Sequence, residues 1–365
     1  MRVKLEDVCV RGSSNLKQSD VIDKTGEYPI YGAAGYIGNV DFYHQDQPYV
    51  AVIKDGAGIG RTSLYPAKSS VIGTMQYLLP KENVLPEYLC YVVKYMRLEK
   101  YFTGATIPHI YFKDYKKEEF NLDTLDRQKE IVNILGRIEC VISSRQQELQ
   151  KLDELIKARF VEMFGDPVAN DMGWNTLPLE KACKSIVDCP HSTPSYTNED
   201  TGFMCIRTSI VKKNKILWDD IEYIPEDEFV KRIQRKKPEV GDIVYTREGA
   251  ILGIAAIIDR DCNVALGQRS MLLSPDIDKC TSEFVCVAMN SDSFLDNVLK
   301  GVSGSASPHI NVGDIKAFRM IMPPVELQKQ FSDFVNQVYK SKVAVQKALD
   351  ETQLLFDSLM QEYFG

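Results

Sequence analysis

The chain has 365 residues, a net charge of −7, 44% apolar residues and 26% charged residues. This length allows two or three folded domains, and the composition excludes a disordered or collagen-like protein. The acidic balance argues against nonspecific nucleic-acid binding, which depends on neutralising phosphates, but it allows a local basic surface on an acidic body.

The spacing of the cysteines and the length of the apolar runs indicate the cellular compartment of the protein. The nine cysteines are scattered without a CxxC pair, so we expect reduced thiols and no zinc ribbon. The opening residues MRVKLEDVCV lack an apolar signal core, and the longest apolar run, 251–258, is too short to cross a bilayer. We therefore expect a cytoplasmic protein with no membrane partner.

Residues 1–124 are predicted to form a first globular unit. The run Tyr49–Ile53 is typical of a buried strand and is followed by the glycine-rich segment Asp55–Gly60. Helical periodicity follows over Pro86–Phe102, and a loop through Pro108-His109-Ile110 then leads out of the unit.

Residues 125–165 are predicted to form one long helix. The stretch contains no proline, and its apolar residues recur at alternating steps of three and four, which places one seam along one helix face. Forty helical residues span roughly 60 Å, so we expect a helical pair or bundle. The seam consists of Leu135, Ile138, Ile142, Leu149, Leu152 and Ile156.

Residues 166–324 are predicted to form a second globular unit that repeats the order of the first. A strand at Asp242–Tyr245 precedes Arg247-Glu248-Gly249, and Pro308-His309-Ile310 repeats the earlier Pro-His-Ile at an offset of 200 residues. The offset is smaller near the start of the unit, so we expect extra surface loop within 188–237.

Residues 325–365 repeat the long helix without a gap at the same offset of 200. The second seam consists of Val335, Val338, Val345, Leu349, Phe356 and Leu359. An antiparallel pair would bury the two seams against each other and close the chain on itself. The expected fold is therefore α+β, with two similar globular units separated by two long antiparallel coiled-coil helices in a pseudo-twofold, cyclic arrangement. We expect the twelve seam residues to dock the helices and partner proteins.

No catalytic or metal-binding motif stands out. Asp55–Gly60 is similar to the phosphate loop of nucleotide-binding enzymes, but the repeat copy lacks the middle glycine and no amphipathic helix follows, so a tight turn between strands is favoured. A docking turn is likewise favoured over catalytic histidines at His109 and His309. The spacing of Cys183, Cys189 and His191 is generic, so no metal site is predicted.

Basic residues that border predicted turns, or that form the dense run at 231–237, are candidates for contact with phosphates or base edges. The candidates are Lys54, Arg61, Arg207, Lys212, Lys213, Lys231, Arg232, Arg235, Lys236, Lys237, Arg247 and Arg269.

Three motifs resemble one known family. The string Glu-Met-Phe-Gly-Asp-Pro at 162–167, the repeated Gly-x-x-x-Pro-His-Ile, and the strand and turn at 241–249 are similar to motifs of type I restriction-modification specificity subunits. Their order and duplication extend the resemblance over nearly the whole chain.

The resemblance implies a non-catalytic reader of double-stranded DNA. Each globular unit would act as a target-recognition domain for one half of a bipartite target. The helices would set the spacing, about thirteen base pairs between half-site centres, and would dock two methyltransferase subunits. Those partners would use S-adenosylmethionine, and two ATP- and Mg²⁺-dependent endonuclease subunits could join them. This chain itself would need no cofactor.

Two other functions stay open from the residues alone. The chain could be a nucleic-acid-modifying enzyme that uses Asp55–Gly60 as a cofactor loop, or an adaptor that binds only proteins. Binding of S-adenosylmethionine to the isolated chain would distinguish the first, and DNA binding by the assembled complex would distinguish the second.

Overall fold

The computed structural model describes residues 1–365 apart from 22, 105–107 and 302–307. The chain forms two compact units. The first contains Met1–Gln147 and Gln346–Gly365, and the second contains Glu148–Val345. Each unit therefore contains a globular part and a segment of both long helices.

The first unit is built around a four-stranded antiparallel sheet in the order β2-β8-β5-β6. A second sheet has the order β4-β3-β7, and β1 pairs with β9. The elements are β1 (Arg2–Lys4), α1 (Leu5–Val8), β2 (Cys9–Ser13), η1 (Gln18–Asp20), β3 (Tyr28–Gly32), β4 (Gly35–Val40), β5 (Tyr49–Ile53), β6 (Thr62–Tyr65), β7 (Ser70–Val71), β8 (Met75–Pro80), α2 (Pro86–Tyr95), η2 (Leu98–Tyr101), α3 (Phe112–Tyr115), β9 (Glu119–Asn121) and the first part of α4 (Leu125–Phe164).

The second unit repeats this plan with the sheet β11-β19-β16-β17. Its elements are the last part of α4, β10 (Thr176–Pro178), α5 (Leu179–Ala182), β11 (Cys183–Asp188), β12 (Met204–Ile206), η3 (Thr208–Ile210), β13 (Val211–Lys212), β14 (Lys215–Ile216), η4 (Trp218–Asp220), β15 (Glu222–Tyr223), α6 (Glu226–Arg232), β16 (Ile243–Thr246), β17 (Ala255–Ile257), β18 (Val264–Leu266), β19 (Ser270–Pro275), α7 (Ser282–Met289), α8 (Asp292–Lys300), α9 (Val312–Ala317), β20 (Arg319–Ile321) and the first part of α10 (Val325–Phe364), whose end belongs to the first unit.

The α+β fold class predicted from the repeat is confirmed, with one difference. Residues 188–237 were expected to add surface loop, but they also contain the hairpin β13–β14 and the helix α6. Helix α6 is amphipathic enough to bury Phe229 against the sheet β15-β12-β18. The extra length therefore forms structure of its own.

The long helices α4 and α10 each contain 40 residues, and in each unit their segments run antiparallel. In the first unit, Ile131 and Leu135 near the start of α4 share a core with Met360 and Phe364 at the end of α10. Farther along, Arg145 donates to the backbone oxygen of Ala348. No described helix is both long and apolar enough to cross a membrane.

The second unit pairs the other ends of the helices. Ile156 and Phe160 of α4 lie in one core with Phe331 and Val335 of α10, and Lys342 pairs with Asp153. Aromatic rings dominate this junction: Phe160 and Phe164 both contact Phe331, at centroid distances of 5.6 and 5.4 Å. Such rings bury large areas, so the helix segments and the globular part form one core.

Candidate nucleic-acid interface

In both units, polar residues gather at the same edge of the four-stranded sheet. In the first unit, strand β5 ends where β8 begins, because Ile53 pairs with Met75. In the second unit, β16 ends where β19 begins, because Thr246 pairs with Ser270. A glycine-rich connection follows each strand. We call it the edge turn, residues 54–61 in the first unit and 247–254 in the second.

The two edge turns close in the same way. The amide of Gly60 donates to the oxygen of Ile53 at 2.9 Å, and that of Gly253 donates to Thr246 at 2.8 Å. Gly56 and Gly249 have φ angles of +86° and +91°, a region that residues with a Cβ rarely adopt. Each turn joins two antiparallel strands, as the sequence indicates, whereas a dinucleotide phosphate loop joins a strand to a helix.

The repeated Pro-His-Ile segment docks on the edge turn in each unit. Gly56 donates to the oxygen of Pro108 at 3.0 Å, and Ile110 donates to Lys54 at 2.9 Å. In the second unit, Gly249 donates to Pro308 at 3.1 Å. In both units, the Pro-His-Ile segment is therefore held on the edge turn by backbone hydrogen bonds, as expected for a docking turn.

The edge turn of the first unit contains a half-exposed charge cluster. Nδ1 of His109 lies 2.7 Å from Oδ1 of Asp55, whose other oxygen lies 3.0 Å from Nζ of Lys54. Arg61 is exposed at the end of the turn, and its guanidinium covers Gly58: a Cβ on Gly58 would lie 2.5 Å from Nη2.

The edge turn of the second unit contains a buried arginine instead. Nε of Arg247 lies 3.0 Å from Asp188, and Nη2 lies 2.8 Å from Glu248. Its side chain is 7% exposed, so two carboxylates neutralise it inside the domain. Arg247 was predicted as a DNA contact, but the structure uses it to join β11, the edge turn and the oxygen of Ile310.

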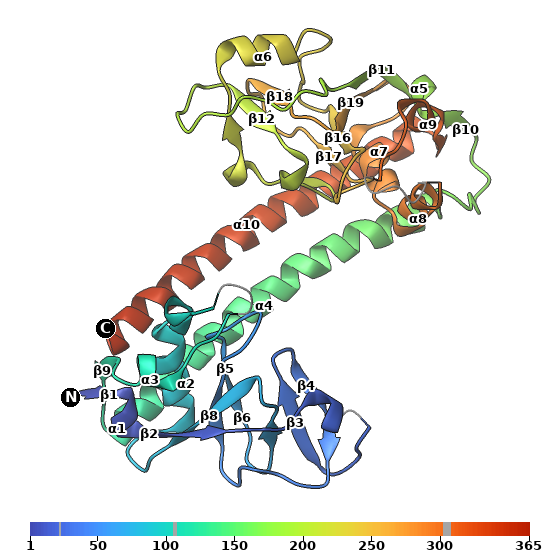
Figure 1. Cartoon of the computed structure of the whole chain (residues 1–365). Coiled ribbons are helices and arrows are strands. Elements are labelled where there is room, and N and C mark those ends of the chain that lie inside the picture. Colours follow the sequence, from blue (N-terminus) through green and yellow to red (C-terminus); the bar gives the residue numbers. More distant parts are fainter. Residues whose placement is uncertain (22, 105–107, 302–307) are drawn as a thin grey trace. The chain divides into compact units, whose positions relative to one another are not determined.

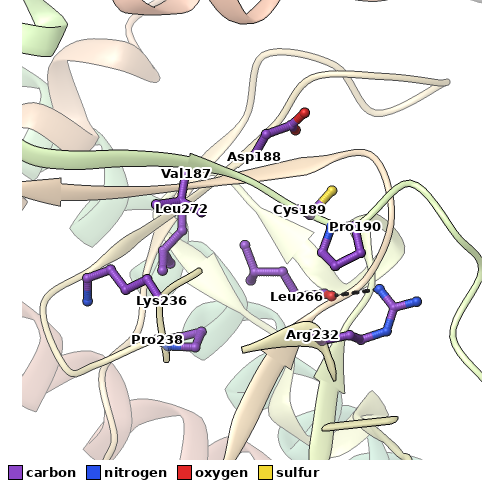
Figure 2. A pocket seen from close by; sticks show the side chains of 9 residues that line it. All are labelled: Val187, Asp188, Cys189, Pro190, Arg232, Lys236, Pro238, Leu266 and Leu272. Carbon is purple, nitrogen blue, oxygen red and sulfur yellow. Dashed lines mark hydrogen bonds between the residues drawn. The ribbon is translucent and has the colours of Figure 1, made fainter. Parts of the chain in front are cut away.

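The basic run 231–237 is also engaged inside the chain. Arg232 is buried, bonds to Glu228 at 2.7 Å, and donates to the backbone oxygens of Leu266 and Ser192. Figure 2 shows the Arg232 guanidinium directed at the backbone oxygen of Leu266. Both residues line a small hollow, with a volume of about 20 Å³. Lys236 bonds to Asp242 at 2.8 Å.

Burial lowers the pKa of Lys236, but the bonds to Asp242 and Glu239 outweigh this and leave that pKa raised. The other members of the run have acceptors too: Lys231 bonds to Asp227, Arg235 to the oxygen of Asp188, and Lys237 to Asn263. The run was predicted to form a contact strip; in this structure Arg232 ties α6 to Leu266 of β18, whereas Lys231 pairs within α6 and stays exposed.

The remaining predicted cations differ in whether their side chains have a hydrogen-bond or carboxylate partner. Arg207 pairs with Glu222 at 2.9 Å, and Lys213 pairs with Asp292 at 2.9 Å. Within the described residues, the side chains of Arg61, Lys212 and Arg269 have no hydrogen-bond acceptor or carboxylate partner. Of the twelve predicted cations, these three are the ones most available to a ligand.

The twelve predicted seam residues all lie on the inward side of the helices. Leu135, Ile156, Val335 and Val338 are buried, and the other eight are half-buried. A different, outward set of apolar residues was missed, because it does not follow the seam spacing. This set, the outward apolar residues, comprises Ile134, Val141, Leu155 and Val161 on α4 and Val343, Leu354 and Leu355 on α10.

No metal site was predicted, and the described residues contain no group of three His, Cys, Asp or Glu side chains that could hold an ion. Cys183 and Cys189 are buried, and His191 is engaged by Asp188 at 3.0 Å. Burial raises the pKa of the Cys183 thiol to about 12, which disfavours the thiolate that a metal needs.

Comparisons with known proteins agree over both halves of the chain. A family model described as type I restriction modification DNA specificity domain matches residues 1–154 and 187–352. The MjaVIII specificity subunit of a type I restriction enzyme from Methanocaldococcus jannaschii is 22% identical over 311 residues, covering 79% of this chain and 72% of its own length. The MjaIX specificity subunit of the same organism is 20% identical over 306 residues, covering 78% and 69%.

Two solved structures share the fold. The S subunit of a type I restriction-modification system from M. genitalium matches with a TM-score of 0.59 and 14% identity, covering 100% of this chain and 96% of that one. A chain from a structure of the assembly and conformational transition of a type I system matches with a TM-score of 0.53 and 16% identity, covering 100% and 97%.

Proposed function

This chain belongs to the family of type I restriction modification DNA specificity proteins, and we propose that each of its two units reads one half of a bipartite DNA target. The observation that carries this proposal is the duplicated sheet edge. Each unit has an edge turn closed by the same backbone hydrogen bond, with an exposed arginine at or beside it that has no carboxylate partner among the described residues: Arg61 ends the first turn, and Arg269, outside the second turn, lies against its Gly249. Because the side chains around the two turns differ, the two half-sites differ in sequence.

The chemistry belongs to partner subunits in this proposal. Methyltransferase subunits bind S-adenosylmethionine and modify adenine, and endonuclease subunits, where they join, use ATP and Mg²⁺. The edge turn at 54–61 supports this division, because it joins two strands and is occupied by Arg61 and the Pro-His-Ile segment. The complex works in the cytoplasm, where cellular DNA is its substrate.

The outward apolar residues are the docking surface for two methyltransferase subunits. Leu354 is 72% exposed and Val343 is 70% exposed, although both lie on helices whose inward faces are already covered. Each unit has exposed apolar side chains of its own, with Leu354 and Leu355 on α10 in the first unit and Leu155 and Val161 on α4 in the second, and exposed apolar surface is typical of protein interfaces. The seam residues were predicted to dock both the helices and the partner proteins. In this proposal they pack α4 against α10, and the outward apolar residues bind the partners.

The helices set the spacing between the half-sites. Seven residues inserted after Glu148 and seven after Lys347 keep the 3.5-residue seam in both helices and lengthen each by about 10 Å. The DNA spacer accepted by the complex should then grow by about three base pairs, at ~3.4 Å per pair. Methylation of targets with stepped spacers measures this, and an unchanged preferred spacer would contradict the role.

The methylome tests the main proposal. Cells with and without this gene are compared by single-molecule sequencing. The expected result is loss of adenine methylation at one bipartite, asymmetric motif. An unchanged methylome, together with no methyltransferase co-purifying with the chain, would contradict it. Tight binding of S-adenosylmethionine by the isolated chain would instead favour an enzyme.

A further inference from the structure

Each edge turn has one exposed arginine in or against it, but the two arginines come from different places in the repeat. Arg61 is the residue before β6, and Arg269 is the residue before β19. The position of Arg61 is occupied in the second unit by Ile254, and the position of Arg269 is occupied in the first unit by Thr74. Sequence alignment of the halves therefore does not pair them, although each side chain reaches the edge turn of its own unit.

Arg61 is fixed by its own backbone. Its amide donates to Gly58 at 3.1 Å, and its oxygen accepts from Ile53 at 3.0 Å. The guanidinium lies on the face of Gly58 where a side chain would project. Ala57 and Gly58 are exposed, so a planar ligand can approach the guanidinium without meeting a bulky neighbour.

Arg269 is held as firmly, in a conformation that is costly for arginine. Its oxygen accepts from Arg247 at 3.0 Å, and its φ is +72°. Nη1 lies 3.5 Å from the point where a Cβ on Gly249 would stand. Glycine or asparagine would adopt this backbone more easily, so an arginine at this position points to a use of its side chain.

Among the described residues, the other cations of the two edge turns are paired with carboxylates, whereas Arg61 and Arg269 are not. Asp188 and Glu248 neutralise Arg247 below Arg269. Lys54 is paired with Asp55 beside Arg61. A guanidinium without a carboxylate partner, on a rigid backbone and beside glycine, offers two parallel donors that match O6 and N7 of guanine in the major groove.

We propose that Arg61 and Arg269 are the guanine-reading residues of the first and second units. The proposal rests on the proposed function and deepens it: the two half-sites, although different, each contain a G·C pair read by the edge turn. Lysine cannot reproduce the forked contact, whereas it can still contact a phosphate.

The test uses the complex assembled with its methyltransferase subunits and a library of random duplex DNA at fixed salt. Complexes carrying Arg61→Lys or Arg269→Lys are compared with the wild type in sequence selection. The matched controls are Arg137→Lys on α4 in the first unit and Arg260→Lys in the second. In the wild-type chain, the Arg260 guanidinium stacks on Trp218. Arg61→Met and Arg269→Met remove the charge as well.

The expected result is position-specific. Arg61→Lys lowers the preference for one guanine in one half-site by roughly tenfold to a hundredfold and leaves the other half-site unchanged. Arg269→Lys does the same in the other half, and the controls select the wild-type motif. The Met variants lose the same preference and bind every sequence more weakly.

Two outcomes would overturn the proposal. Unchanged selection by both Lys variants would exclude guanine reading, and so would an equal loss of affinity for all sequences, which indicates a phosphate contact. A wild-type complex that selects no bipartite motif would instead contradict the proposed function itself.

Discussion

The two edge turns share their closing hydrogen bond and a left-handed glycine at Gly56 and Gly249, and they differ in the charges beneath them. In the first unit, Lys54 occupies the position of Arg247, and its side chain is 25% exposed where that of Arg247 is 7% exposed. The backbone hydrogen bonds to Pro108 and Pro308 are nevertheless alike. The fold therefore needs the turn and its docked segment, while the charges around them are free to differ between half-sites.

The largest expected contrast concerns the two cations beneath the turns. Arg247→Met leaves Asp188 and Glu248 without their shared partner inside the domain, which should cost about 3–5 kcal/mol of unfolding free energy. Lys54→Met breaks a more exposed pair and should cost about 0–1 kcal/mol. Urea unfolding of the full chain measures both. Equal losses would show that the two turns do not differ as described, and Asp188→Asn combined with Arg247→Met should recover part of the loss.

The glycines of the turns should respond alike. Alanine at Gly56 or at Gly249 must adopt a φ near +90°, which costs about 1–2 kcal/mol for a residue with a Cβ. Space is available at Gly56, where a Cβ meets nothing within 4 Å, so the loss there reports backbone strain alone. Thermal unfolding of both variants checks this. An alanine tolerated without loss in one unit would argue against a shared backbone frame.

The smallest expected effect concerns the ionisation of one buried thiol in each unit. Cys9 and Cys183 begin the equivalent strands β2 and β11, and burial raises the pKa of each thiol to about 12. Unfolded thiols ionise from about pH 9. These two therefore stabilise the fold below pH 9, and that contribution is lost as pH rises toward 12. A thiol reagent at pH 8 should modify the exposed Cys140 first; rapid modification of Cys9 or Cys183 in folded protein would contradict their burial.

Much of the architecture follows from local pattern. The three- and four-residue spacing places Leu135 and Val335 in the cores, and glycine spacing predicts both edge turns. Pairing between distant residues does not follow from such patterns. Arg247 meets Asp188, 59 residues away, and Arg232 meets the oxygen of Leu266, 34 residues away, so neither could be recognised as internal from sequence.

The outward apolar residues also could not be predicted from local sequence pattern. Leu354 and Leu355 lie among polar neighbours and break no periodic rule, so they carry no signal until the helix faces are known. The convergence of Arg61 and Arg269 on equivalent turns is also invisible in the repeat, because the two arginines align with Ile254 and Thr74. The pairing of strands in each sheet brings each arginine to the edge turn of its own unit.

The exchange of one unit's globular part tests the central claim most directly. Residues 174–324 are replaced by the corresponding segment of a family member with a different target, and the methylated motif is read by single-molecule sequencing. If each unit reads its own half-site, one half of the motif changes to that of the donor and the other half stays the same. A change in both halves, or in neither, would contradict independent reading by the two units.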